Sequence, residues 1–430
     1  MDYKHRIMVS LARAIKEGQV NKKKIIDTAL GECLLESSDT EELKQRLSRY
    51  LDSLLEEHQG EVPLVRMFAQ YCRNCDSLEE RCVSNCPTQA IKKDSGGKKY
   101  IDHHLCIDCG FCVDSCLAGA LIMRTEFARV AAMLYQEEET PVYAIMAPSF
   151  VGQFGPEATP QVLKAALKEL GFTDVFEVAM AADVVTLHEA HEFVERMEGG
   201  SQFMITSCCC PVFIKLVEKV RPKVAHLVSP SVSPMIAMAK LLKKSEPGCR
   251  VVFIGPCIAK KNEALRPDLQ PGVDSVLTYK ETQALFEATD LDLSGSLGQE
   301  ILSDASYDGR AYGATGGVTD AIRAAIKVIS PNLEVRAVKG DGVKDCNRLL
   351  TEMEQGKLEG NFMEGMGCVG GCVGGPGCIL PVEKGREQML KFAREALVNR
   401  SYENDSAVDW EREFAQDGDF HSAKIHRDQK

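Results

Sequence analysis

The spacing of apolar positions predicts a helical beginning to the chain and a charged end. Over residues 1–66, apolar side chains recur every three or four positions, as in Ile7, Leu11 and Ile15, and these intervals return to one face of an α-helix. We predict a short helical N-terminal segment here, packed on the segment that follows it at residues 67–126 rather than docking a partner. Residues 401–430 are rich in charge, so we expect them to form a peripheral tail.

Two short apolar runs in the middle of the chain predict buried parallel strands. They cover residues 203–205 and 251–254, and each is continuous rather than alternating, which is typical of strands covered on both faces. A cysteine-containing loop follows each run directly, at 206–213 and 255–263. Binding sites in open α/β sheets form beyond the carboxyl ends of the strands, so we expect both loops to contribute to one site.

A third cysteine loop, at 364–377, sets Cys368 and Cys372 in a run that is mostly glycine. Glycine lets the main chain approach a neighbour closely and adopt dihedral angles that are closed to other residues. We therefore expect a bulky inorganic group to lie against this backbone. Thiolates are soft ligands that suit iron–sulfur clusters, which makes both cysteines candidate metal ligands. The alternative, a glycine-rich turn with two buried thiols, leaves the two upstream cysteine loops unexplained.

Composition excludes several classes of protein. The chain has 430 residues, of which 44% are hydrophobic, enough for two or three domains with sizeable cores. It contains no run of roughly 20 apolar residues and no signal-peptide pattern, so we expect a cytoplasmic protein without a membrane partner. The formal net charge of -12 disfavours nucleic acid as a partner. The 18 cysteines indicate metal binding, because cytosolic reductants keep thiols free.

Residues 67–126 contain two cysteine runs that resemble a bacterial two-cluster ferredoxin. The first run is C-x2-C-x6-C-x3-C followed by proline, with a longer second gap than usual, and the second is C-x2-C-x2-C-x3-C without the proline. In such ferredoxins the fourth cysteine of each run binds the other cluster. The resemblance therefore implies two 4Fe-4S clusters, one held by Cys72, Cys75, Cys82 and Cys116 and the other by Cys86, Cys106, Cys109 and Cys112.

Two further features of this segment are expected. Residues 90–102, with adjacent glycines and several lysines, predict a hairpin between the two cysteine runs. A structural zinc site also uses paired C-x2-C elements. The third cysteine at the same short spacing in the second run favours a 4Fe-4S cluster instead.

The three later loops resemble the signature loops of the FeFe hydrogenases, and they occur in that family's order. They read TSCCCP, PCIAKKNE and CVGGCVGG, where the family forms are TSCCP, PCxxKxxE and CxxxCxxGG. The resemblance covers roughly residues 140–400. It implies an α/β fold, with a two-lobed catalytic domain of parallel sheets at 140–400. An α+β ferredoxin-like domain at 67–126 and the helical segment at 1–66 precede that domain.

The resemblance also implies an activity and a cofactor. The activity is the reversible conversion of protons and electrons into H2. The cofactor is the H-cluster, a 4Fe-4S cubane bridged by one cysteine to a diiron unit with CO, CN and dithiolate ligands. Ferredoxin or a similar electron carrier and the hydrogenase maturation proteins are the expected protein partners.

Individual roles follow from matching this sequence to the family's loops. The implied cubane ligands are Cys210, Cys257, Cys368 and Cys372, with Cys372 shared with the diiron unit. The residues expected to contact or orient the diiron unit are Lys260, Glu263 and Met366. The expected proton relay consists of Cys209, Glu189, Glu192 and Ser229. Without the resemblance, the two glutamates would be interpreted as exposed carboxylates on one helix face.

The triple cysteine leaves two alignments open. Anchored on Pro211, the loop makes Cys209 the proton donor and Cys210 the ligand, which is the alignment we adopt. Anchored on Thr206, it makes Cys208 the donor and Cys209 the ligand.

The diiron pocket also departs from the family pattern at two positions. Gly255 stands where the family usually has methionine, and Met235 stands where it usually has glutamine. Two alternative functions therefore remain, an H2 sensor with slow turnover and a hydrogenase-like iron–sulfur assembly protein. The sequence shows no PAS-type signalling domain, and it retains the lysine and the carboxylates of the catalytic pocket.

Overall fold

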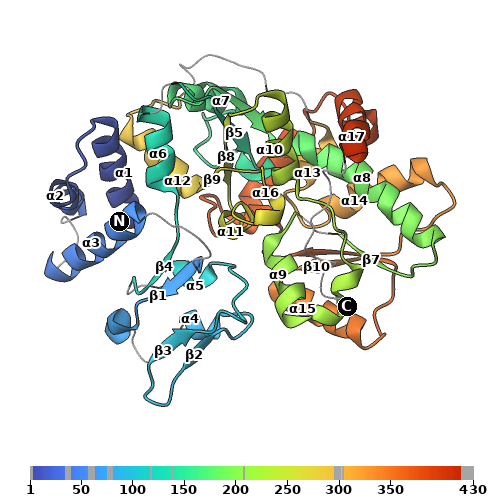
Figure 1. Ribbon diagram of the computed structural model, residues 1–430, viewed down its shortest axis with the longest axis horizontal. Helices are drawn as coiled ribbons and strands as arrows, with labels where there is room; N and C mark the ends of the chain where they lie inside the picture. The colour runs from blue at the N-terminus through green and yellow to red at the C-terminus, as the bar shows by residue number, and fades with distance from the viewer. Residues whose placement is uncertain are drawn as a thin grey trace.

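The computed structural model describes residues 3–33, 40–56, 63–74, 81–116, 119–136, 139–206, 209–294, 302 and 305–417. The described part contains two parallel sheets, two antiparallel strand pairs and a group of N-terminal helices (Figure 1). The expected two-lobed α/β architecture with parallel sheets is therefore confirmed. None of the described helices is long and apolar enough to cross a bilayer.

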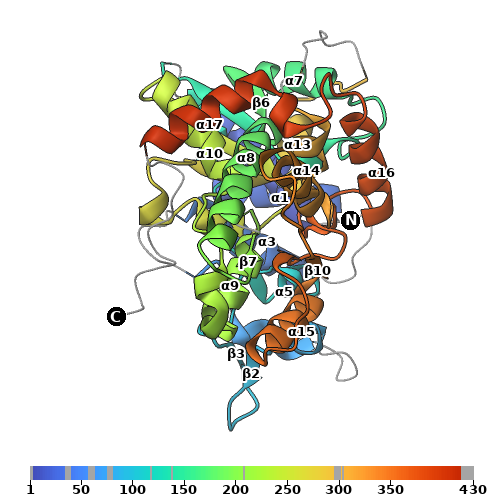
Figure 2. The same cartoon turned by 90° about the vertical axis from the view of Figure 1, so that its right-hand side faces the viewer.

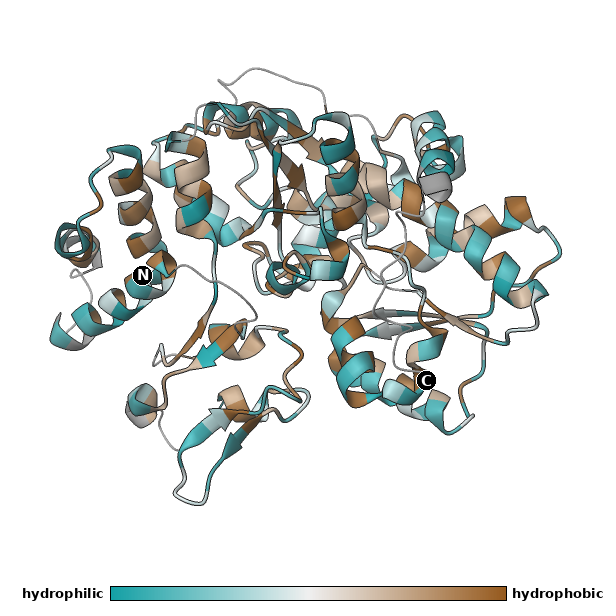
Figure 3. Ribbon diagram, in the orientation of Figure 1, coloured by the Kyte–Doolittle hydropathy of each residue, from teal (hydrophilic) through white to brown (hydrophobic). Residues whose placement is uncertain are grey.

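The first lobe is built on a four-stranded parallel sheet in the order β6-β5-β8-β9. Its two central strands, β5 and β8, are almost entirely buried and mostly apolar (Figure 3), as is typical of strands covered on both faces. The predicted strand at 251–254 lies in β8. The elements of this lobe are β5 (Val142–Met146), α7 (Pro160–Glu169), β6 (Asp174–Glu177), α10 (Pro234–Ser245), β8 (Arg250–Gly255), α11 (Lys260–Glu263), β9 (Ser275–Thr278), α12 (Tyr279–Ala288), α13 (Tyr307–Ala311) and α16 (Val382–Ala393).

The second lobe is built on a three-stranded parallel sheet in the order β10-β11-β7. The predicted strand at 203–205 is β7, which pairs with β11 through Met204 and Ile205. The elements of this lobe are β7 (Met204–Ile205), α9 (Pro211–Val220), α14 (Gly317–Ile329), β10 (Ala337–Asp341), α15 (Val343–Glu354) and β11 (Phe362–Met366). The long helix α8 (Val178–Glu198) contacts α10 of the first lobe and α14 of the second, so it connects the two.

The segment with the paired cysteine runs consists of two antiparallel strand pairs and two short helices. Strand β1 pairs with β4, and β2 pairs with β3 as the predicted hairpin, which projects from the molecule in Figure 2. Pairing of β1 starts at Val65, so this segment begins before the expected boundary between residues 66 and 67. Its elements are β1 (Val65–Met67), α4 (Arg81–Ser84), β2 (Ile91–Lys93), β3 (Lys99–Ile101), α5 (Phe111–Asp114) and β4 (Leu121–Met123).

The N-terminal helices pack chiefly against the first lobe, whereas the prediction was that they pack on residues 67–126. Helix α1 contacts α12 and α6, and its apolar side chains join the core of that lobe. His5 Nε2 lies 2.6 Å from Glu287 Oε2 on α12, and Arg6 pairs with the same carboxylate. These elements are α1 (Tyr3–Lys16), α2 (Lys22–Cys33), α3 (Thr40–Leu55) and α6 (Phe127–Gln136).

The C-terminal segment differs from the peripheral tail expected at 401–430. Its described part, 401–417, forms a short 3-10 turn and helix α17 (Asp405–Asp417), and α17 packs on α8. The cause is the fully buried carboxylate of Asp183, which needs donors. Ser401 Oγ donates to Asp183 Oδ1 at 2.7 Å and Asn404 Nδ2 to Oδ2 at 3.0 Å. Residues 418–430 lie outside the described part.

The contact between α17 and α8 is expected to depend on pH. Glu411 Oε1 lies 3.7 Å from Nδ1 of both His188 and His191. Contact with His188 and His191 lowers the pKa of Glu411 from 4.5 to about 2, and contact with Glu411 raises the pKa of His191 above 6.5. The contribution of the Glu411 carboxylate to the stability of this contact is lost as pH falls through about 2. The contribution of the His191 imidazole is lost as pH rises through its raised pKa. The contact is therefore strongest between pH 4.5 and 6.5.

We predict that amide-exchange protection in α17, corrected for intrinsic rates, falls as pH rises from mildly acidic to alkaline. Glu411→Gln should remove this dependence. Glu413→Gln is the matched control, because Glu413 pairs with Lys244 at 2.6 Å, and lysine keeps its charge over that range. Equal pH dependence in the wild type and Glu411→Gln would refute the prediction.

Candidate functional site

The three cysteine loops follow the carboxyl ends of strands that belong to two different sheets. The first loop follows β7 and the third follows β11, which are neighbours in the second lobe, whereas the second loop follows β8 in the first lobe. The loops therefore meet between the lobes, and not at the edge of one sheet. Pro211 occupies the first turn of α9, so this helix begins directly after Cys210.

The glycines of the third loop allow close contact between protein backbones. The N–H of Gly377 donates to the carbonyl of Pro256 at 2.8 Å, and a Cβ atom at Gly375 would lie 2.8 Å from that same carbonyl oxygen. A Cβ atom at Gly371 would lie 2.7 Å from the backbone nitrogen of Thr315. These glycines therefore allow the third loop to pack closely against other protein loops.

Four candidate ligands come together where the three loops meet: Cys210, Cys257, Cys368 and Cys372. Burial raises the pKa of Cys368 well above its ordinary value, and the other three thiolates raise it further. Burial likewise raises the pKa of Cys257 to about 12, with Cys210 as the next cause. The N–H of Gly367 donates to Cys210 Sγ at 3.3 Å. Four thiols gathered in one buried place can bind an iron–sulfur cluster, whose irons would stabilise them as thiolates.

The number of these thiols matches the four ligands of a cubane. Within the described ranges, no three His, Cys, Asp or Glu side chains form a group that could hold one metal ion. A cubane binds each thiolate at a separate iron, so its four ligands stand further apart than those of zinc. The residues present therefore fit the cubane that the sequence implied.

Lys260 lies in a buried group of polar residues on the second loop. It is 6% exposed, and its Nζ lies 2.7 Å from Glu263 Oε2 and donates to Ser233 Oγ at 3.0 Å. Ser233 in turn donates to Glu263 Oε1 at 2.5 Å. Burial alone lowers the pKa of Lys260, but the charge and hydrogen bond of Glu263 together with the neighbouring thiolates outweigh it, and the net direction is upward. The ammonium is therefore held charged in a fixed position.

The two candidate relay glutamates lie three residues apart on α8. Glu189 is fully buried and accepts a 2.6 Å hydrogen bond from Thr206 Oγ1 at its Oε2. Glu192 accepts a 2.6 Å hydrogen bond from Ser229 Oγ, and its Oε1 lies 2.6 Å from Arg196 Nη2. The structure thus brings Ser229 to Glu192, as the sequence implied.

Cys209 lies within the electrostatic influence of both the lysine and the buried glutamate. Burial raises its pKa well above the ordinary value, and the thiolates of Cys372 and Cys210 raise it further. Lys260 acts in the opposite direction, and Glu189 raises it again. Cys209 is thus placed between the carboxylate and the metal ligands. Cys208 lies outside the described residues, so the two alignments of the triple cysteine remain a matter for experiment.

The cysteines of the antiparallel segment form a second group. A single pocket bounded by the hairpin residues Ile91 and Ile101 is lined by Cys86, Cys106, Cys109 and Cys112. These four are the residues assigned from the sequence to one 4Fe-4S cluster. Of the other set, Cys82 and Cys116 pack in one apolar cluster, Cys72 lies in a 3-10 turn, and Cys75 is outside the described part.

The two departures from the family pattern lie in the buried wall of the site. The Phe253 ring occupies the space beside Gly255, where an added Cβ would lie 2.5 Å from its Cε1 atom. Met235 and Met366 are buried in the same apolar cluster as that ring, and Cys209 and Cys210 pack against it. The pocket wall is therefore more hydrocarbon-like than the family pattern at these positions, which reduces hydrogen bonding near a bound cluster.

Three residues of the site were not predicted as functional from the sequence. Thr206 holds Glu189, Ser233 joins Lys260 to Glu263, and Arg196 pairs with Glu192. Arg196 stands four residues after Glu192, which is a helix-pairing signal. Ser233 before proline is a helix N-cap signal, but neither signal indicates a chemical role.

Several known proteins are similar to this chain in sequence. Iron hydrogenase 1 of Clostridium pasteurianum is 26% identical over 405 residues, which cover 78% of this chain and 70% of that protein. The NADP-reducing hydrogenase subunit HndD of Solidesulfovibrio fructosivorans is 27% identical, with coverage of 72% and 63%. The human nuclear prelamin A recognition factor is 29% identical, with coverage of 54% and 61%. The chain thus spans about two thirds of the length of these relatives.

Solved structures support the fold. A structure of the FeFe hydrogenase HydA1 from Chlamydomonas reinhardtii matches with a TM-score of 0.55 and 24% identity, covering 68% of this chain and 94% of that one. The family model for the C-terminal domain of the iron-only hydrogenase large subunit matches residues 140–376, which is more than half of the chain and includes the three loops. This confirms the resemblance found in the sequence, and the chain belongs to the iron-only hydrogenase large-subunit family.

Proposed function

We propose that this protein is an FeFe hydrogenase that interconverts protons, electrons and H2. The observation that carries the proposal is the buried group of Lys260, Glu263 and Ser233 beside four converging thiols. Cys210, Cys257, Cys368 and Cys372 would hold the cubane, and Cys372 would share its thiolate with the diiron unit. When bound, the diiron unit supplies the metal at which protons and electrons combine.

The lysine group has a defined role in this proposal. A buried ammonium is costly unless it is paired, and Lys260 is paired on one side by Glu263 and Ser233. Its remaining donor capacity suits an anionic ligand terminus such as cyanide, because an ammonium is a compact cation with three donors. Glu263 then orients the lysine rather than contacting the metal itself.

The chain also offers groups that would move protons to the site. Arg196 is about one-fifth exposed, so it marks the outer end of the series. Glu192 with Ser229 follows, then Glu189 with Thr206, and Cys209 forms the inner end. Each of these groups lies on α8 or on a loop next to it, and positioned acids and bases transfer protons most effectively at hydrogen-bond distance.

Electrons would enter through the antiparallel segment. We propose two 4Fe-4S clusters there, one held by Cys72, Cys75, Cys82 and Cys116 and the other by Cys86, Cys106, Cys109 and Cys112. Ferredoxin or a similar carrier would be the external partner, and hydrogenase maturation proteins would install the diiron unit. The free thiols suit a reducing compartment such as the cytoplasm.

A second candidate is an iron–sulfur protein of this family without rapid H2 turnover. The similarity to the prelamin A recognition factor and to a probable cytosolic Fe-S cluster assembly factor of Aedes aegypti, 24% identical, keeps this alternative open. Phe253 beside Gly255, together with Met235, also makes the pocket wall unlike that of the family pattern. Retention of Lys260 and of the buried carboxylates favours the hydrogenase.

Infrared spectroscopy of anaerobically matured protein tests the two candidates. We expect CO and CN stretching bands together with H2 evolution from a strong reductant. Bands without turnover would favour a sensor, and iron–sulfur clusters without bands would favour the assembly-type protein. Cys372→Ala should lose the bands entirely, because one thiolate must join the two parts of the cofactor.

Cys209→Ala should keep the infrared bands but lower turnover by about 100-fold to 10,000-fold, the usual contribution of an acid–base group. A methyl group cannot carry a proton between Glu189 and the metal. Cys208→Ala should have a mild effect, and Cys210→Ala should lose the cubane. Loss of the cubane in Cys209→Ala together with blocked turnover in Cys208→Ala would show that the other alignment is correct.

Glu189→Gln should also lower turnover steeply while the bands stay unchanged. The amide keeps the shape and accepts the hydrogen bond from Thr206, but it does not exchange a proton. Glu195→Gln is the matched control, because Glu195 lies on the same helix and is exposed. Equal turnover in both variants would exclude Glu189 from the relay.

A further inference from the structure

The loop at residues 106–112 carries three of the four cysteines proposed to hold one electron-relay cluster, and we call it the relay loop. It makes polar contact with both lobes of the catalytic domain. Asp108 stands between Cys106 and Cys109, has a positive φ of 58°, and is 6% exposed. Its Oδ2 atom accepts a 2.7 Å hydrogen bond from Asn262 Nδ2 and pairs with Lys215. Asn262 belongs to the loop after Cys257, and Lys215 to the helix after Cys210. One carboxylate thus joins three cysteine loops.

Helix α9 contributes a second lysine to the same loop. Lys219 Nζ donates to the carbonyl of Cys106 at 2.7 Å and to that of His103 at 2.8 Å. Lys215 and Lys219 are four residues apart, which places them on one face of the helix. That face is therefore directed at the relay loop, with one ammonium on the Asp108 carboxylate and the other on backbone carbonyls.

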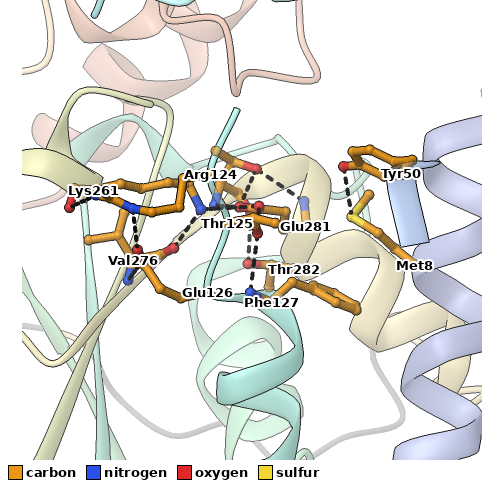
Figure 4. A network of polar contacts seen from close by, with 11 residues as sticks. Met8, Tyr50, Arg124, Thr125, Glu126, Phe127, Lys261, Val276, Glu281 and Thr282 are labelled. Carbon is orange, nitrogen blue, oxygen red and sulfur yellow. Dashed lines mark hydrogen bonds and ion pairs between the residues drawn. The ribbon is translucent and has the colours of Figure 1, made fainter. Parts of the chain in front are cut away.

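Asn262 is held from two directions by the antiparallel segment. While its Nδ2 donates to Asp108, its Oδ1 accepts a 2.7 Å hydrogen bond from Arg124 Nη2, and the same guanidinium nitrogen donates to the carbonyl of Lys261 at 2.9 Å. Arg124 is 1% exposed. Figure 4 shows Arg124 beside Lys261, which pairs with Glu281 at 3.0 Å. Both hydrogen-bonding ends of this amide thus join the segment to the catalytic loop.

The two cysteine loops also approach each other sterically. A Cβ atom at Gly110, which follows Cys109, would lie 2.5 Å from Ile258 Cδ1, which follows Cys257. Cys109 and Cys257 pack against one apolar cluster. The thiolate of Cys109 is also among the charges that act on Cys368. These contacts identify the Cys86, Cys106, Cys109 and Cys112 group as the neighbour of the catalytic site.

We propose that the Asp108–Asn262 hydrogen bond is a positioning contact that fixes the second relay cluster against the catalytic cubane and sets its reduction potential. The proposal rests on the cluster assignments of the proposed function. Asn262 and Asp108 are positioning residues, because they act through the cysteine loops and not on the reacting atoms. Asp108 also places a negative charge beside this cluster's ligands, with Oδ1 lying 3.6 Å from Cys106 Sγ.

The first experiment tests position. The variant is Asn262→Leu in full-length protein expressed without maturation proteins, so that it carries cubanes only, and the probe is electron paramagnetic resonance after full reduction. In the wild type we expect magnetic coupling between the relay cluster and the catalytic cubane. Asn262→Leu should weaken or abolish this coupling while the iron content stays unchanged.

Asn347→Leu is the matched control for this variant. Asn347 also accepts an arginine hydrogen bond, from Arg221 Nε at 2.8 Å, and is similarly half-buried, but it lies on α15 away from the relay loop. It should leave the coupling intact. Equal coupling in wild type and Asn262→Leu would overturn the positioning role.

The second experiment tests charge and does not depend on the first. Asp108→Asn keeps the shape but removes the negative charge and leaves the Lys215 ammonium unneutralised near the cluster. An added electron is then stabilised, so we expect the reduction potential of one relay cluster to shift upward while the other is unchanged. Asp114→Asn is the control, because Asp114 is about half exposed and water screens its charge. No shift, or an equal shift in the control, would overturn the proposal.

These outcomes are separable from the proposed function. Both experiments are read from iron–sulfur clusters alone and require no H2 chemistry. If the matured wild type is active but the variants show unchanged coupling and potential, only the positioning contact is refuted. If the matured wild type is inactive but the variants show the predicted changes in coupling and potential, only the hydrogenase function is refuted.

Discussion

Four thiolates from two separate sheets have to meet in one buried place, and much of the structure depends on that requirement. Cys257 comes from the first lobe, whereas Cys210, Cys368 and Cys372 come from the second. The lobes can approach this closely only because the third loop has glycines, which carry no side chain, where it meets the Pro256 carbonyl. Helix α8 then holds both lobes at a fixed distance by packing on helices of each.

Buried charges around the site are paired, and the pairs join separate parts of the chain. Lys261 and Glu281 are almost fully buried and connect the second loop to the start of α12, where Glu281 also completes a capping box with Thr278. Such pairs add little net stability, because desolvation offsets their attraction. Removing one partner is costly, however, so they tolerate only one arrangement of the loops. Their contribution here is to geometry more than to free energy.

The sequence predicted the parts of the site that depend on local spacing. The strands before the cysteine loops and the helix with Glu189 and Glu192 appear as expected. Contacts across long sequence separations were not predictable. Asp108 and Asn262 are 154 residues apart, and each alone looks like an ordinary polar residue in a loop. The resemblance implied two lobes with parallel sheets, but which strand pairs with which was not predicted, because short apolar runs do not specify their partners.

The anchoring of α8 by the C-terminal segment has a consequence for the order of events during synthesis. Asp183 receives two of its hydrogen-bond donors from Ser401 and Asn404, which emerge from the ribosome more than 200 residues later. Before that point, the backbone N–H and the hydroxyl of Ser306 are the donors that can reach the Asp183 carboxylate. Because domains fold largely as units from the N-terminus, the paired cysteine runs can close around their clusters early. The lobes around the three later loops reach their final packing only after residues 401–404 have been synthesised, so the site for the last cofactor matures after the sites that feed it.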